Sequence, residues 1–213
     1  VDPGGNMTYT GLLMAMQRFF PSRGLDYIFA THADPDIIAS MNKWMVATHC
    51  KVMISRLWTR FIPHFTTGKD YTARIIGIPD EGMNILLGEN KIKAVPAHFM
   101  HSEGNFQFYD PVSKILFSGD MGASLVDHVQ AAEPVRNFDD HVVTMLGFHR
   151  RYMISNKICR FWVNMVRQMD VEMIVPQHGC RFEGKVMVNR FLDWIEQLPC
   201  GVDVMTQDSY RVP

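Results

Sequence analysis

The spacing of hydrophobic and polar positions divides the chain into three stretches. The first shows helical spacing of apolar residues interrupted by short apolar runs, and the middle shows short runs separated by turn signals such as Pro79-Asp80. The last returns to helical spacing around one more strand. The expected helices cover 8–20, 37–47, 139–169 and 185–197, and the expected strands cover 25–30, 51–55, 71–78, 83–87, 92–96, 105–110, 114–118 and 171–176. This order predicts an α/β fold in which helices cover the faces of sheets.

Composition is typical of a globular protein. Of the 213 residues, 47% are hydrophobic and 20% are charged, which excludes a disordered chain. The net charge of -1 argues against sequence-independent binding to nucleic acid, and no apolar run is long enough to span a membrane. The four cysteines show no paired spacing, which suits a reducing compartment. We therefore expect a single cytoplasmic domain over residues 1–213.

Histidine and aspartate residues recur at the ends of the expected strands. Four short motifs contain them: H-A-D-P-D at 32–36, H-F-M-H-S-E-G at 98–104, F-S-G-D-M-G at 117–122 and V-P-Q-H-G at 175–179. Loops held by a rigid sheet are where binding residues concentrate. Each motif alone is a weak signal, because Asp36 could cap a helix beginning at Ile37 and Asp120 could be an ordinary turn residue.

The four motifs, in this order, resemble the metallo-β-lactamase superfamily. That pattern is H-x-[HDE]-x-D-H, a histidine in a G-H-S-x-G-like turn, an aspartate after an F-S-G-D-like strand and a histidine in an H-G-like turn. The opening Asp2-Pro3-Gly4-Gly5 also resembles the family's D-x-G turn. The resemblance implies an αββα sandwich. Because the family's first strands precede the D-x-G turn, it also implies that N-terminal strands are missing from the given sequence.

The second motif position selects a branch of the superfamily. Zinc hydrolases usually carry histidine there and a further histidine after the second aspartate, whereas this chain has Asp34 and Ile37. A carboxylate at that position resembles the flavodiiron branch, although Asp34 is one methylene shorter than that branch's glutamate. The segment F-H-R-R-Y at 148–152 is also similar to that branch.

The resemblance implies a site for two metal ions. Transferred position by position, it assigns His32, Asp34 and His101 to one metal, Asp36 and His178 to the other, and Asp120 to the bridge. Carboxylates with imidazoles suit iron or manganese, whereas thiolate-rich sets suit zinc. We therefore expect two iron ions, with manganese or zinc as weaker alternatives. Ile37, in place of the family's histidine, is expected to make the open side of the second metal apolar, as in a pocket for dioxygen.

Several further residues have open roles. His98 lies three residues before His101, and we favour His101 as the ligand because the turn after it continues the family motif. His98 would then orient a ligand or be structural. His149 and Tyr152 are candidates to line the pocket, and Cys180 is expected near the site without a redox role. Four other histidines are interpreted as structural: His49, His64, His128 and His141.

Flavodiiron relatives reduce dioxygen or nitric oxide with electrons from an appended flavodoxin domain. The residues after Gly179 are too few for such a domain, and no phosphate-binding glycine loop is present, so we expect no FMN in this chain. Our first hypothesis is a non-haem diiron protein that binds and senses dioxygen and signals to a partner protein. The second is an oxygen or nitric oxide reductase supplied by a separate electron-donor protein, and the third is a metal-dependent hydrolase. Whether the chain is an enzyme, and whether it forms a homodimer, stay open.

Overall fold

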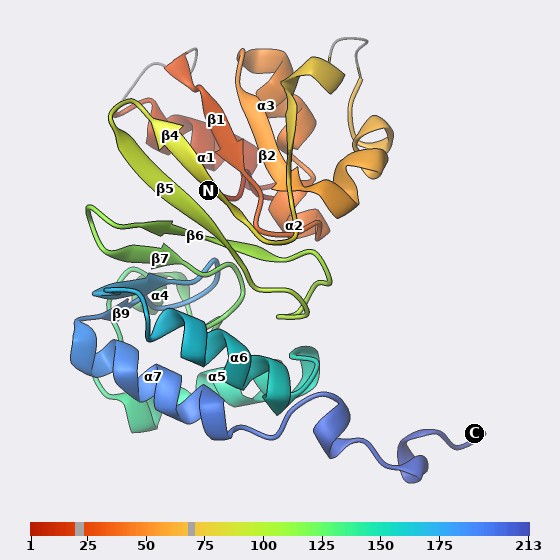
Figure 1. The fold of residues 1–213 in the computed structure, drawn as a ribbon, viewed down its shortest axis with the longest axis vertical. Coiled ribbons are helices and arrows are strands. Elements are labelled where there is room, and N and C mark those ends of the chain that lie inside the picture. Colours follow the sequence, from red (N-terminus) through yellow and green to blue (C-terminus); the bar gives the residue numbers. More distant parts are fainter. Residues whose placement is uncertain (20–23, 68–70) are drawn as a thin grey trace.

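Two β-sheets lie face to face between two layers of helices (Figure 1). The computed structural model describes residues 1–19, 24–67 and 71–213. Three clusters of buried apolar side chains fill the spaces between the four layers. Trp44 belongs to the cluster under the first helices, Phe106 to the cluster between the sheets, and Phe191 to the cluster under the last helices. The αββα sandwich predicted from the motifs is confirmed.

The N-terminal half forms the smaller sheet and its helices. The strands β1 (Tyr27–Phe29), β2 (Lys51–Ser55) and β3 (Ile75–Ile78) run parallel in that order. The helices α1 (Tyr9–Met16), α2 (Pro35–Ile38) and α3 (Met41–Ala47) lie in the same half. Two 3-10 segments, η2 (Arg56–His64) and η3 (Thr72–Arg74), connect β2 to β3.

The C-terminal half forms a sheet of six strands in sequence order. Its strands are β4 (Met83–Leu87), β5 (Asn90–Pro96), β6 (Phe106–Asp110), β7 (Ile115–Phe117), β8 (Met173–Val175) and β9 (Phe182–Glu183). Neighbouring strands are antiparallel except β7 and β8, which are parallel. Its helices are α4 (His128–Ala131), α5 (Phe138–Tyr152), α6 (Asn156–Val166) and α7 (Lys185–Gln197). Within the described ranges, no helix is long and apolar enough to cross a membrane.

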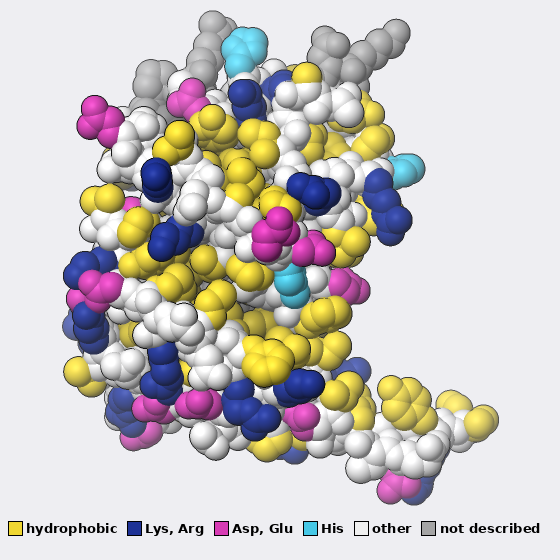
Figure 2. All heavy atoms as spheres, viewed as in Figure 1, with side chains coloured by type: hydrophobic (Ala, Val, Ile, Leu, Met, Phe, Trp, Pro, Cys, Tyr) yellow, Lys and Arg dark blue, Asp and Glu magenta, His cyan; other side chains and the backbone are white. Residues whose placement is uncertain are grey.

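The chain beyond α7 leaves the helical layer. It contains two short 3-10 turns, η4 (Val202–Val204) and η5 (Gln207–Ser209). Figure 1 shows this segment running outward from the end of α7, and Figure 2 shows the hollow between it and the body of the molecule.

Local pattern predicted several elements with correct bounds, and tertiary contacts changed others. The strands β2 and β4 and the helix α7 begin and end as expected. The helix expected over 37–47 is instead two helices: α2 starts earlier because Pro35 occupies its first turn, and the helix is interrupted before α3 begins at Met41. The helix expected over 139–169 is divided at 153–155 into α5 and α6. The first helix, expected over 8–20, ends earlier, at Met16, and is followed by a turn at 17–19; residue 20 lies outside the described residues.

A buried polar bridge connects the helix α6 to the strand β6 and to the turn after β7. The indole Nε1 of Trp162 on α6 donates to Oε1 of Gln107 on β6 at 2.8 Å, and Nε2 of Gln107 donates to the backbone oxygen of Ser118 at 3.0 Å. Gln107 and Ser118 are fully buried. Ser118 begins the turn that carries Asp120, so the bridge ties that turn to the core.

Trp162→Phe should therefore destabilise the fold by about 1–3 kcal/mol, because Oε1 of Gln107 would be buried without a donor. Urea denaturation followed by circular dichroism measures this loss. Trp194→Phe is the control, since Trp194 is only partly buried on α7. Equal losses in the two variants would show that the hydrogen bond to Gln107 contributes nothing beyond packing.

Candidate metal centre

The six side chains assigned as ligands from the motifs meet at one end of the sandwich. His32 and Asp34 follow β1, and Asp36 lies in the first turn of α2. The other three come from the C-terminal half: His101 from the loop after β5, Asp120 from the turn after β7, and His178 from the loop after β8. Loops from both sheets therefore supply the site, which is how residues far apart in sequence become neighbours.

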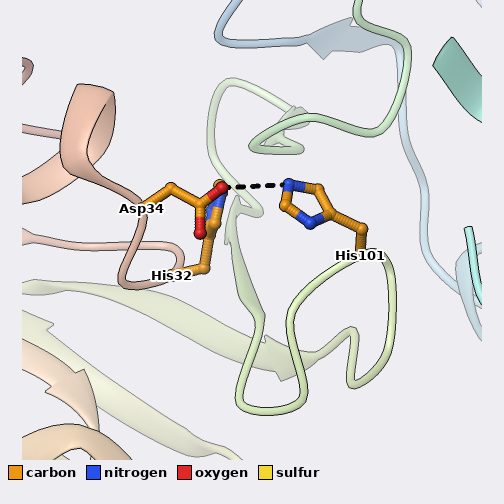
Figure 3. Close-up of side chains that lie close together, drawn as sticks. All are labelled: His32, Asp34 and His101. Carbon is orange, nitrogen blue, oxygen red and sulfur yellow. Dashed lines mark ion pairs between the residues drawn. The ribbon is translucent and has the colours of Figure 1, made fainter. Parts of the chain in front are cut away.

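His32, Asp34 and His101 form the first half of this site. Their ligand atoms lie within 4.8 Å of one another, and Figure 3 shows the three side chains pointing toward a common centre. Oδ2 of Asp34 is 3.4 Å from Nε2 of His101 and 3.7 Å from Nε2 of His32. Oδ2 of Asp120 approaches the same two nitrogens, at 3.1 Å and 3.5 Å.

Asp36 and His178 form the second half. Nε2 of His178 is 3.0 Å from Oδ2 of Asp36 and 3.8 Å from Oδ1 of Asp120. The two oxygens of Asp120 thus face different halves of the site. Exposure varies within the site: His32 and Asp120 are 0% and 7% exposed, whereas Asp34, His178 and Asp36 are 41%, 48% and 57% exposed.

The charges and unpaired atoms of the site fit a cation. Among the described residues, Nε2 of His32 and Oδ1 of Asp120 are buried without a hydrogen-bond partner, although buried polar atoms normally have one. Burial opposes ionisation of Asp120, but the hydrogen bond from His101 and the close approach of His32 outweigh it and hold the pKa of Asp120 well below its usual range. Burial also opposes a charge on His32, and its contact with the Asp120 carboxylate overcomes this and raises the pKa of His32.

Comparison with known proteins identifies the family. Residues 1–179 match the family model described as ODP family beta lactamase. The chain belongs to this ODP family. Two solved structures of the chemotaxis sensor ODP, one of a peroxy diiron species and one of the apo state from T. denticola, are each 42% identical to it, with TM-scores of 0.87 and 0.88. Each comparison covers 95% of this chain and 82% of the solved one.

Other relatives are more distant. A flavodiiron protein from Giardia intestinalis is 15% identical with a TM-score of 0.79, over 92% of this chain and 48% of that protein, and this likeness shows the shared fold. An uncharacterized protein from Methanocaldococcus jannaschii is 20% identical over 202 residues, which are 91% of this chain and 49% of that protein. The ODP family chain therefore spans about half the length of this curated relative.

A buried hydrogen-bond chain supports His32 in this ODP family chain. The hydroxyl of Thr31 lies 2.9 Å from Nδ1 of His32 and donates to Oδ2 of Asp2 at 3.1 Å. The backbone amide of Thr31 donates to the other oxygen of Asp2 at 2.8 Å. Nδ1 of His32 is thereby hydrogen-bonded to Thr31, and the other ring nitrogen, Nε2, faces Asp34 and Asp120. Thr31 was not among the predicted residues; the D-x-G-like turn at Asp2 was the sequence signal for this support.

The residues with open roles take different places. His98 lies outside the site: its Nε2 is 2.8 Å from the backbone oxygen of Asp80, and its ring packs on Phe106. The thiol of Cys180 donates to the backbone oxygen of Gln130. The preference for His101 over His98 as the residue facing the site agrees with this geometry.

His149 and Tyr152 both approach the site from α5. The ring of Tyr152 lies 5.5 Å from that of His101, edge to face, and the ring of Phe148 lies 6.0 Å from it. His149 is fully buried and reaches the Asp120 turn instead of lining a pocket, because its Nε2 accepts from the amide of Gly122.

The apolar surroundings of the site differ from the expectation. Ile37 was expected to line the open side of the second metal, and this is wrong: Ile37 is fully buried in the cluster under the first helices. A cavity of about 380 Å³ instead opens beside Asp34 and His101. Its aromatic wall is formed by Trp58, Phe61 and Phe65, from a 3-10 segment and the residue after it that hydrophobic periodicity did not predict.

The stability of the metal-free protein should fall in acid through His149. Burial lowers the pKa of His149 to about 4, whereas an unfolded histidine has a pKa of about 6.5. Folding therefore favours the neutral ring, and this contribution is complete above about pH 6.5 and is lost as the pH falls towards 4.

His149→Gln removes the titrating group. Between pH 7 and pH 4, the unfolding free energy of the wild type should fall by up to about 3 kcal/mol more than that of the variant. Urea denaturation at several pH values measures both. Parallel pH profiles for the wild type and the variant would show that folding does not lower the pKa of His149.

Proposed function

We propose that this chain is a non-haem diiron protein that binds dioxygen at the six-residue site and serves as an oxygen sensor. The observation that carries the proposal is the position of Asp120, whose two oxygens face two separate His/Asp groups. A carboxylate between two such groups suits a pair of cations a few ångströms apart better than a single one. The resemblance to the chemotaxis sensor ODP, solved as a peroxy diiron species, supports iron and dioxygen as the ligands.

The six ligands are divided between two iron ions according to their distances from one another. His32, Asp34 and His101 would hold one iron, Asp36 and His178 the other, and Asp120 both. The donors are carboxylate oxygens and imidazole nitrogens without a thiolate, a set that favours iron over zinc. Three carboxylates offset most of the charge of two divalent ions. When bound, iron supplies the electrons with which dioxygen can be held, while the chain orients the ligands and shields the inner half from water.

The exposure of the two halves suggests how a ligand approaches. In the first half, His32 is fully buried, but Asp34 is 41% exposed beside the aromatic-walled cavity; in the second half, Asp36 and His178 are about half exposed. A small neutral molecule can therefore reach the site from the side of the second metal or through the cavity beside Asp34 and His101. We infer that the chain is a cytoplasmic sensor and that the change at its metal site on binding dioxygen is transmitted to a signalling protein. The sensor can work as a homodimer.

A reductase remains the second candidate, because flavodiiron proteins share this fold. In that case, a separate electron-donor protein would bind near the site and dioxygen or nitric oxide would be consumed. The aromatic-walled cavity beside Asp34 and His101 is a surface where such a donor could approach.

Iron loading and exposure to air test the proposed function. The metal-free protein is loaded with Fe(II) under nitrogen, desalted and analysed for metal, and is then exposed to air while its visible spectrum is recorded. We expect two irons per chain and a visible band that persists for minutes or longer. Rapid, repeated oxygen consumption with an added donor would favour the reductase. Preferential binding of zinc without any reaction with oxygen would contradict both.

Asp120→Asn tests the bridge. The substitution keeps the shape of the side chain but replaces one carboxylate oxygen by an amide nitrogen, so one half of the site loses a ligand. We expect one iron or fewer per chain after desalting, against two in the wild type. Asp127→Asn is the control, because Asp127 caps α4 through the amides of Val129 and Gln130. Two firmly bound irons in Asp120→Asn would rule out the bridging role.

A further inference from the structure

One turn of α5 contacts both His101 and the turn that carries Asp120. Phe148 and Tyr152 pack against the ring of His101, at centroid distances of 6.0 and 5.5 Å. Between them in sequence, His149 points to the core side and reaches the turn that carries Asp120. A helix that supplies no ligand thus contacts a ligand of the first half and the turn of the bridging residue.

The hydrogen bonds of His149 are those of a neutral ring in one tautomer. Nδ1 lies 2.9 Å from the backbone oxygen of Met145, to which it must donate, since a carbonyl can only accept. Nε2 is then the unprotonated nitrogen and accepts from the amide of Gly122 at 2.9 Å. The ring is fully buried and is enclosed by Phe148, Phe191 and Trp194.

The amide of Gly122 depends on this acceptor. The neighbouring amides are satisfied inside the turn, because that of Met121 donates to Ser118 and that of Ala123 donates to Asp120. The amide of Gly122 turns toward α5 instead. Without His149 it would be a buried donor without a partner, which costs about 1–3 kcal/mol.

The path of the turn leaves little room for another arrangement. Gly122 has a φ of 97°, and a Cβ at this position would lie 2.8 Å from the ring of Phe182. The amide of Gln177 donates to the oxygen of Gly119 from the other side. Asp120 is therefore held between one bond from the loop before His178 and one bond from His149.

We propose that His149 is a positioning residue for the two-metal site: by accepting from Gly122, it keeps Asp120 oriented with one oxygen toward each half. The inference rests on the proposed diiron function and adds a residue that is not itself a ligand. His149 acts through the backbone turn and not by contact with metal or dioxygen. Losing its acceptor atom allows the carboxylate to rotate, and the more exposed half, held by Asp36 and His178, is the first to lose its metal.

The chain contains a matched control for this residue. His141 lies on the same helix two turns earlier, is also buried, and packs edge to face on Phe182. Among the described residues, its Nε2 has no hydrogen-bond partner. His141→Phe therefore changes a buried histidine of α5 that makes no hydrogen bond to the Asp120 turn.

The experiment compares His149→Phe, His149→Gln and His141→Phe in the full chain. Phenylalanine fills the space of the ring but has no acceptor, whereas the glutamine oxygen can reach the position of Nε2. In the metal-free proteins, amide exchange at Gly122 followed by NMR should be fastest in His149→Phe. On Fe(II) titration, we expect this variant to bind the second iron about 10–100-fold more weakly and to shift or lose the band seen in air. His149→Gln should recover most of both, and His141→Phe should behave as the wild type apart from stability.

Each outcome decides the inference. If His149→Phe binds two irons with wild-type affinity and spectrum, His149 is only a core residue, and the diiron function stands without it. If the wild type itself does not bind two irons, the proposed function fails and the inference fails with it. Equal effects of His149→Phe and His141→Phe on iron binding would assign both to general destabilisation and overturn the specific role. If His149→Phe does not fold, His149→Leu, which also lacks an acceptor, takes its place.

Discussion

The carboxylate of Asp120, buried between three imidazoles, is the constraint on which the rest of this molecule depends. Burying an ionised carboxylate costs free energy unless opposite charges or hydrogen bonds compensate it. Contacts from His101 and His32 compensate it here and keep the pKa of Asp120 low. One of its oxygens nevertheless stays without a hydrogen-bond partner among the described residues. A buried oxygen without a hydrogen-bond partner is tolerated where a bound ligand interacts with it. Because the two oxygens of Asp120 face two different His/Asp groups, a cation at each group would supply that interaction.

The αββα sandwich brings the ligands to that carboxylate. Each of the two sheets is covered by helices, and three apolar clusters hold the four layers in register. The parallel pairing of β7 with β8 places Asp120 and His178 after neighbouring strand ends. His32 and Asp34 arrive from the other sheet, after β1. The rigid layers thus set positions that the loops alone could not maintain.

Support from outside the ligand set gives the site its precision. Asp2 and Thr31 engage the far nitrogen of His32, and His149 engages the turn of Asp120. The hydrogen bond with Thr31 restricts rotation of the His32 ring. The hydrogen bond from the Gly122 amide to His149 restricts rotation of the Asp120 carboxylate through its turn. The buried ligands His32 and Asp120 are supported in this way, while Asp36 and His178 stay open to solvent.

The motifs alone were enough to predict the donor types, their order and the fold family. Spacing of two or 3.6 residues identifies strands and helices such as β4 and α7, because that spacing depends only on local geometry. The tertiary structure decided what local pattern does not contain: that His101 and not His98 faces the site, that Ile37 is in the core, and that His149 supports a turn. The direction of a side chain depends on which distant segment packs against it. Asp120 shows both contributions. Its motif predicted a ligand, and only the folded chain placed one of its oxygens toward His101 and the other toward His178.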